Sequence, residues 1–150
     1  RTGLGLMVKA GAAKLDVGTV DAFKRTLLAA KSVTYVPAGA SGVAFLATAK
    51  QLGIAPALES KTKAAASGDE VNTNVTSGGA EIAILPVSEI LPVKGAALGG
   101  VFPADVQTYI VMGGALSPKA SQAARDFLAR LTASASDAVI TARGMERVKP

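Results

Sequence analysis

The residues whose types and spacing best suit ligand chemistry are the small residues at positions 38–42 (AGASG), which separate a predicted strand from a predicted helix. Small side chains let backbone N–H groups approach a ligand closely, and a helix N-terminus carries about half a positive charge. Ser41 adds a hydroxyl. The loop at 38–42 is therefore a candidate anion site. An ordinary strand-to-helix turn, in which Ser41 only caps the helix, would have the same residues.

Two further places offer groups to such a site. A predicted helix begins near Asp69, so the amides around Val71 would be free to contact a ligand, unless Asp69 only caps that helix. Residues 85–89 (LPVSE) follow a predicted strand, and ligands of open α/β sheets gather at the carboxyl ends of strands. Ser88 and Glu89 are therefore candidates as well, although Ser88 could simply cap a short helix.

The residue inventory narrows the possible chemistry. The chain has 150 residues and contains neither Cys nor His, which excludes disulfides, thiolate and imidazole metal ligands, and Ser-His-Asp catalysis. Only Ser41 with Lys31 or Lys50 offers a nucleophile and a base, and Lys50 lies roughly two and a half helical turns beyond Ser41. We expect no catalytic residue, no metal site and no cofactor.

The charge pattern speaks against nucleic acid as a partner. Sixteen Lys and Arg against 11 Asp and Glu give a net charge of +5, a sign that suits a small anion. The basic residues are scattered, with no three adjacent, and only two Tyr and four Phe are available to stack on bases. Apolar residues make up 49% of the chain, and the longest apolar run falls short of the roughly 20 residues that a membrane span needs. The composition predicts a folded domain with a substantial core.

Strands and helices alternate along the predicted order, which indicates an α/β fold with a mostly parallel sheet. We expect Thr19 to cap the first helix, Gly53 to end the second, and Ser117 to begin a C-terminal helix. The polar stretch 59–68 is expected to be a loop with some helical character. Predicted strands cover 3–9, 33–36, 80–85, about 96–98 and 106–112, and predicted helices cover 20–30, 43–52, 69–76, 117 onward and 134–144.

Six segments, in this order, match a known pattern: GLGLMVKAGA at 3–12, VGTVDAFK at 17–24, GASGV at 39–43, AEIAILPVSEILP at 80–92, PADVQTY at 103–109 and ARGME at 142–146. Together they resemble bacterial periplasmic solute-binding proteins of the molybdate-binding-protein-like type, the family 11 extracellular solute-binding proteins. The resemblance rests on the series across nearly the whole chain and not on any single segment.

The resemblance implies a type II periplasmic binding fold, in which two α/β lobes are joined by two crossing strands with the ligand in the cleft. Residues 1–112 would then form lobe two with both hinge-crossing strands, and residues 113–150 would be C-terminal helices of lobe one. The first half of lobe one and a signal peptide would precede Arg1. The expected location is the periplasm.

The function implied is the substrate-binding component of a bacterial ABC importer, which is not an enzyme and which delivers its ligand to the transporter's membrane component. Such a protein captures a small anion with backbone amides and hydroxyls. Pro86 can offer a ligand neither a hydroxyl nor an N–H, so this position does not single out one anion. The ligand could be a molybdate-like oxyanion or an organic carboxylate. The expected ligand-binding residues are Ala40, Ser41, Gly42, Val71, Pro86 and Ser88.

Two alternatives stay open beside the importer component. The first is a fragment outside transport, or a self-associating module that pairs as a homodimer through its lobe-one-facing surface; an apolar stripe that needs a partner motivates it, formed by Ala124, Phe127, Leu128 and Leu131. The second is the effector-binding lobe of a transcription regulator, which can share the fold.

Overall fold

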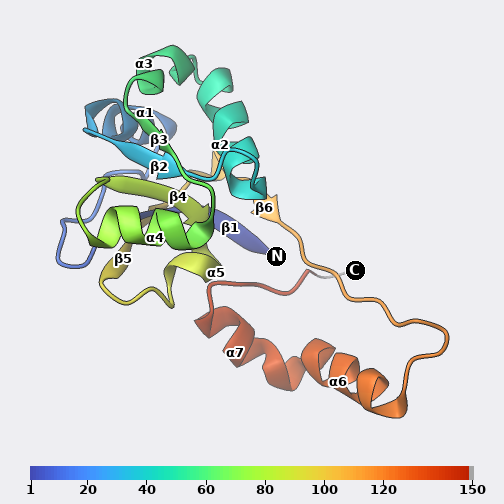
Figure 1. The fold of residues 1–150 in the computed structure, drawn as a ribbon. Helices are drawn as coiled ribbons and strands as arrows, with labels where there is room; N and C mark the ends of the chain where they lie inside the picture. The colour runs from blue at the N-terminus through green and yellow to red at the C-terminus, as the bar shows by residue number, and fades with distance from the viewer. Residues whose placement is uncertain (149–150) are drawn as a thin grey trace.

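The sheet at the centre of the molecule has the strand order β3-β2-β4-β1-β5, and a further strand, β6, pairs with β1. The computed structural model describes residues 1–148 (Figure 1). β2 runs parallel to β3 and β4, whereas β1 runs antiparallel to β4, β5 and β6, so β1 alone is reversed. The predicted α/β class and mostly parallel sheet are confirmed. The strands are β1 Thr2–Lys9, β2 Val33–Tyr35, β3 Thr62–Ala64, β4 Ile82–Pro86, β5 Ala96–Val101 and β6 Tyr109–Ile110.

Helices cover both faces of this sheet. Side chains alternate across a strand, so Ile82 and Ile84 of β4 join one core cluster while Ala83 and Leu85 join the other. The first cluster packs against α1 Val20–Ala29, α2 Ala40–Gln51 and α3 Ala55–Glu59, and the second packs against α4 Gly68–Thr76 and α5 Val87–Ile90. The result is a three-layer α/β/α arrangement, which we call the sheet lobe (residues 1–110).

The ends of the helices follow local signals in most places. The Thr19 hydroxyl accepts from the Ala22 amide at 3.1 Å and caps α1, as predicted. Gly53 follows the end of α2 with φ +70°, a left-handed backbone conformation that glycine adopts without the steric cost that a residue with a side chain would have. α4 differs from the prediction, because its cap is Ser67 and not Asp69: the Ser67 hydroxyl accepts from the Glu70 amide at 3.2 Å.

One predicted strand was too long, and one strand was missed in a stretch that was predicted to be a loop with some helical character. The predicted strand at 106–112 is reduced to β6, preceded by a single 3-10 turn at Ala104–Val106, because only Thr2 and Gly3 are available as pairing partners. The polar stretch 59–68 holds β3, an edge strand beside β2. Edge strands keep exposed, polar side chains, which is why the hydrophobic pattern did not reveal it.

The C-terminal helices begin later than predicted. α6 covers Gln122–Thr132, with Ser121 and not Ser117 as its cap, because residues 117–120 close a turn first. A 3-10 turn at Ser134–Ser136 and α7 Asp137–Ala142 follow, and Gly144 comes next with φ +70°. Figure 1 shows α6 and α7 set apart from the sheet, beyond an extended segment. Within residues 111–148, which we call the C-terminal arm, no side chain is buried.

The arm returns to the sheet lobe at β1. The Glu146 amide donates to the Arg1 carbonyl at 2.8 Å, and the Glu146 carboxylate pairs with the Arg1 side chain at 2.9 Å. The Thr2 hydroxyl donates to the Gly144 carbonyl at 2.9 Å. Gly144 also lies close against the side chains of Val87 and Leu91, so residues 144–146 form the attachment of the arm to the sheet lobe. The assignment of 1–112 and 113–150 to two lobes stays a prediction, and positions 149 and 150 lie outside the described residues.

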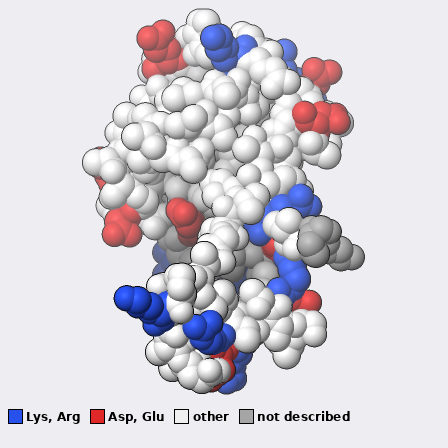
Figure 2. Space-filling view, turned by 90° about the vertical axis from the view of Figure 1, so that its right-hand side faces the viewer, with Lys and Arg blue, Asp and Glu red and all other residues white. Residues whose placement is uncertain are grey.

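Charge is unevenly distributed over the surface. In Figure 2 the basic side chains of the arm gather below, while much of the visible face of the sheet lobe is uncharged. None of the helices in residues 1–148 is long and apolar enough to cross a lipid bilayer.

Candidate functional site

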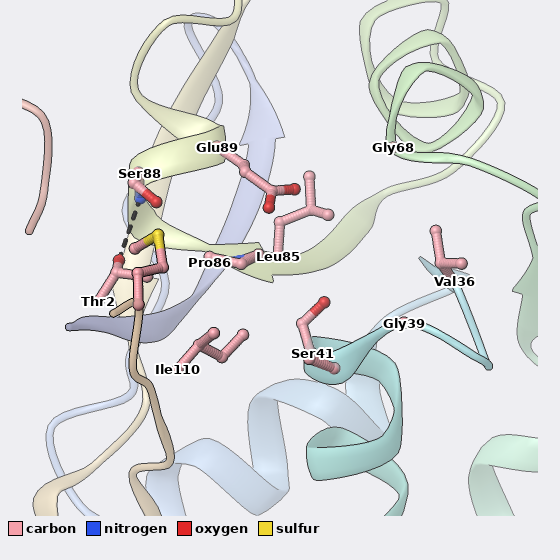
Figure 3. A pocket seen from close by; sticks show the side chains of 12 residues that line it. Thr2, Val36, Gly39, Ser41, Gly68, Leu85, Pro86, Ser88, Glu89 and Ile110 are labelled. Atoms are coloured by element: carbon pink, nitrogen blue, oxygen red, sulfur yellow. Dashed lines mark hydrogen bonds between the residues drawn. The ribbon is translucent and has the colours of Figure 1, made fainter. Parts of the chain in front are cut away.

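A pocket of about 290 Å³ opens where the N-terminus of α2 faces the end of β4 and helix α5 (Figure 3). We call it the α2–β4 pocket. It lies at the carboxyl end of the parallel strands, where open α/β sheets bind their ligands. It is lined by Thr2, Val36, Gly39, Ala40, Ser41, Gly68, Leu85, Pro86, Ser88, Glu89, Ile110 and Met112.

The N-terminus of α2 supplies free amide donors to this pocket. Gly39 is the N-cap and has no side chain that could occupy the first amides, and the first intrahelical bond runs from the Val43 amide to the Gly39 carbonyl at 2.9 Å. The amides of Ala40, Ser41 and Gly42 therefore lack intrahelical partners. Together with the helix dipole they form a ready anion site.

Gly42 shapes this turn without lining the pocket. A Cβ atom at position 42 would lie 1.9 Å from the carbonyl oxygen of Val36, so only glycine fits there. The close approach holds the first turn of α2 against the end of β2. The predicted role of Gly42 as a direct contact stays a prediction, whereas its packing role follows from the geometry.

Ser41 is the most telling side chain of the site. It is only 6% exposed, and its hydroxyl makes no hydrogen bond to any described residue. In Figure 3 this hydroxyl points into the pocket. Among the described residues the one buried side-chain polar atom without a partner is Asn72 Oδ1, so the Ser41 hydroxyl is open to the pocket and free to hydrogen-bond to a ligand.

The N-terminus of α4 contributes through Gly68 and not through Val71. Val71 is fully buried in the second core cluster, and its amide already donates to the Ser67 carbonyl at 3.1 Å. Gly68 is the first residue of α4 and lines the pocket, and the amides of Gly68 and Asp69 have no intrahelical partner. The structure therefore does not bring Val71 together with the other predicted residues. The Ser67 cap was the sequence signal that could have pointed to Gly68.

The end of β4 forms the opposite wall. Pro86 closes the strand opposite Leu4 of β1, and its ring presents an apolar surface to the pocket. The Ser88 amide donates to the Thr2 hydroxyl at 3.3 Å, so this amide is occupied, while the Ser88 side chain lines the pocket. Thr2, Ile110 and Met112 join the lining because β6 pairs with the start of β1, a long-range contact that local sequence patterns do not reveal.

Glu89 places a carboxylate in the same pocket. Its side chain projects from α5 into the hollow, and a Cβ atom at Gly68 would lie 3.8 Å from its Oε2. The carboxylate has no ion-pair or hydrogen-bond partner within residues 1–148, and no Lys or Arg lines the pocket. Burial raises the pKa of Glu89 above its ordinary value, because desolvation disfavours the charged form.

The described residues contain no group of three or more acidic side chains that could hold a metal ion. A second hollow of about 430 Å³ lies at the outer edge between α2 and α3 and is walled mainly by apolar side chains such as Phe45 and Leu58. The α2–β4 pocket is the stronger candidate, because the N-terminal turns of both α2 and α4 open into it.

The sequence model of the family described as bacterial extracellular solute-binding protein matches residues 1–146. The chain belongs to this family. This confirms the resemblance drawn from the six sequence segments. No curated relative matches the sequence.

Two solved structures share the fold of this solute-binding protein. One, assigned as the substrate-binding domain of a molybdenum ABC transporter from Clostridium difficile, is 18% identical with a TM-score of 0.69. The other, the periplasmic molybdate-binding protein of Azotobacter vinelandii, is 16% identical with a TM-score of 0.60. Each likeness covers 99% of this chain, and 65% and 67% of those proteins respectively. The chain thus spans about two thirds of the length of the structures that it matches.

Proposed function

We propose that this solute-binding protein captures a small anion in the α2–β4 pocket and serves as the binding component of a bacterial ABC importer. The observation that supports this most directly is the Ser41 hydroxyl, which has no hydrogen-bond partner among the described residues and points into the pocket beside the free amides of α2. Family membership supports the solute-binding role. The protein would act by binding alone, without catalysis.

The proposed binding mode uses dipoles and not side-chain cations. The amides of Ala40 and Ser41 would donate to the anion, with the Ser41 and Ser88 hydroxyls completing its shell and Gly68 adding an amide from α4. Pro86 would shape the wall. Such a site holds an anion through helix N-termini without any Lys or Arg. Molybdate-like oxyanions are supported by the names of the two similar structures, and small organic carboxylates fit the same donors.

The surrounding arrangement is proposed on the same grounds. The sheet lobe would be the second lobe of a two-lobed protein, with β1 and β6 as the crossing strands, and the arm would pack on the other lobe. The ligand would be enclosed when the lobes close and handed to a membrane component of the transporter. A periplasmic location follows from this role and is supported by the likeness to a periplasmic protein.

The test is a thermal-shift titration of the full chain with molybdate, sulfate, inorganic phosphate and a set of small carboxylates. Binding raises the free energy of unfolding by about 2.7 kcal/mol at a hundredfold excess over Kd, so a true ligand should raise the Tm by several degrees. Ser41→Ala should weaken the shift, and Ser134→Ala, at an exposed position in the arm, should leave it unchanged. Absence of a shift with every anion would overturn the proposal.

A second role, self-association, is favoured by one specific observation. Phe127 and Leu131 of α6 are 64% and 48% exposed, and Val139 of α7 is 64% exposed. A second copy or the rest of a two-lobed protein would cover such a face. Light scattering separates the two, because a strictly monomeric solution would refute a homodimer.

A further inference from the structure

The α2–β4 pocket holds a charge of the wrong sign for a simple anion site. The amides of α2 and α4 and the Ser41 hydroxyl are donors that suit an anion, yet Glu89 is the only charged side chain in the lining. In Figure 3 the Glu89 carboxylate and the Ser41 hydroxyl point into the same hollow from α5 and from α2. A ligand in this hollow would therefore meet donors on one side and a carboxylate on the other.

We infer that Glu89 selects anions that carry their own hydrogen-bond donor, such as hydrogen phosphate or a hydroxy or amino carboxylate, over fully deprotonated oxyanions such as sulfate and molybdate. This inference rests on the proposed anion-binding function and names the ligand class for the same site. Glu89 is a specificity-determining residue in this view.

The physical reason is the missing partner of the carboxylate. Within residues 1–148 no group donates a hydrogen bond to the Glu89 carboxylate, and no cationic side chain forms an ion pair with it. A fully deprotonated anion held by α2 would repel it, and the repulsion is stronger in a partly desolvated pocket than in water. A ligand hydroxyl, ammonium or acid proton would instead donate to the carboxylate in a charge-assisted hydrogen bond. The raised pKa of Glu89 agrees with a carboxylate that lacks such a donor.

The difference in affinity between the two classes of anion is large because Glu89 strengthens the binding of one and weakens the binding of the other. The favoured anion gains a hydrogen bond, while the disfavoured anion leaves a carboxylate facing it without compensation. The donor groups around Ser41 would hold both anions alike. The difference in affinity between two anions of the same shape therefore reports on Glu89.

The experiment uses two matched pairs of probes on the full chain near neutral pH, measured by isothermal titration calorimetry. Inorganic phosphate retains at least one proton there and sulfate retains none, although both are small and tetrahedral. Lactate carries a hydroxyl and propionate lacks it. We expect the wild-type protein to bind the donor-carrying member of each pair at least about tenfold more tightly, the scale of one charge-assisted hydrogen bond.

Glu89→Gln removes the charge at nearly constant shape, and it should raise the affinity for sulfate and reduce each preference to about threefold or less. Glu89→Ala tests the same point without any amide. Glu59→Gln, a carboxylate outside the α2–β4 pocket, is the matched control and should keep the wild-type preference. Circular dichroism of the unliganded variants checks that each one folds.

Three results would overturn the inference. Equal preferences in the wild-type protein and Glu89→Gln, with anions still bound, would make Glu89 a bystander and leave the proposed function standing. Sulfate binding by the wild-type protein with uptake of one proton, detected from the buffer dependence of the enthalpy, would make Glu89 a donor instead of an acceptor. Failure of every probe to bind to the wild-type protein and to all variants would remove the proposed function as well.

Discussion

The sheet lobe and the C-terminal arm both contain helices with apolar side chains, but only the sheet lobe buries such side chains in a core. In the sheet lobe, Phe23 is fully buried and its ring centroid lies 4.6 Å from that of Phe102. In the arm, Phe127 is 64% exposed on an amphipathic helix, none of whose residues is buried. An apolar stripe therefore favours a helix locally, but its side chains become buried only where another surface packs against them.

The largest difference between the two regions is expected when one phenylalanine in each is replaced by alanine. Phe23→Ala should lower the free energy of unfolding by about 3–5 kcal/mol, because it removes a buried ring and leaves a cavity. Phe127→Ala should change it by less than about 0.5 kcal/mol. Urea denaturation measures both. A loss of several kcal/mol for Phe127→Ala would mean that the arm is packed against something in solution.

The next largest effect is expected at the turn that carries the candidate site. Gly42→Ala should cost about 1–3 kcal/mol, because its methyl group would collide with the backbone of Val36. The same substitution at Gly18, where nothing lies within 4 Å and φ is not positive, is the matched control and should be nearly neutral. Chemical denaturation of both variants tests this, and an equally neutral Gly42→Ala would contradict the close approach of α2 to β2.

The sheet lobe and the arm each contain a helix whose serine cap makes the same hydrogen bond. Ser67 accepts from the Glu70 amide in α4 and Ser121 accepts from the Ala124 amide in α6, each at 3.2 Å. Ser67→Ala should lower the global free energy of unfolding by about 1 kcal/mol, because α4 packs on the sheet. Ser121→Ala should mainly speed local amide hydrogen exchange in α6, since a region without a core opens separately. Equal global losses would show that the two regions unfold as one unit.

The smallest expected effect concerns pH and Glu89. Burial raises the pKa of Glu89 in the folded protein, so folding favours its protonated form. The stability that this contributes is present below about pH 4 and is lost as the pH rises through the folded pKa. Glu89→Gln should therefore gain stability relative to the wild-type protein at neutral pH but not at low pH. Solvent screening keeps the gain below about 1 kcal/mol; thermal melts across pH 3–8 measure it, and a constant difference would contradict the shift.

Local signals predicted much of the sheet lobe. The Thr19 cap, the helix end at Gly53 and the strand predicted at 80–85 each depend on a few neighbouring residues, and each is found in the structure, the strand as β4. The loop at 38–42 was likewise singled out from small residues between a strand and a helix, and its residues Gly39, Ala40 and Ser41 line the α2–β4 pocket. These features could be predicted because each depends on interactions between residues that are close in the sequence.

Predictions failed where a distant partner decides the outcome. The propensity of residues 106–112 for a strand is real, yet β6 stops after Ile110 because β1 offers it only two residues to pair with. β3 forms in a polar stretch because β2 presents an open edge. Packing also decides which residue of α4 reaches the pocket, because Val71 turns into the core and Gly68 lines the hollow, while the role predicted for Val71 in binding stays a prediction.

The α/β class, the cap of the first helix, the anion-suited loop at Ser41 and a chemistry without Cys or His could be derived from the sequence, because composition and local hydrogen bonding set all of these. Only the tertiary structure decided that Thr2, Gly68 and Glu89 share one pocket with Ser41. Those residues come from separate strands and helices, and they meet because β1 pairs in reverse with β4 and β6 and because α4 and α5 pack beside β4. The carboxylate opposite the anion-suited amides is therefore a product of packing and not of any motif.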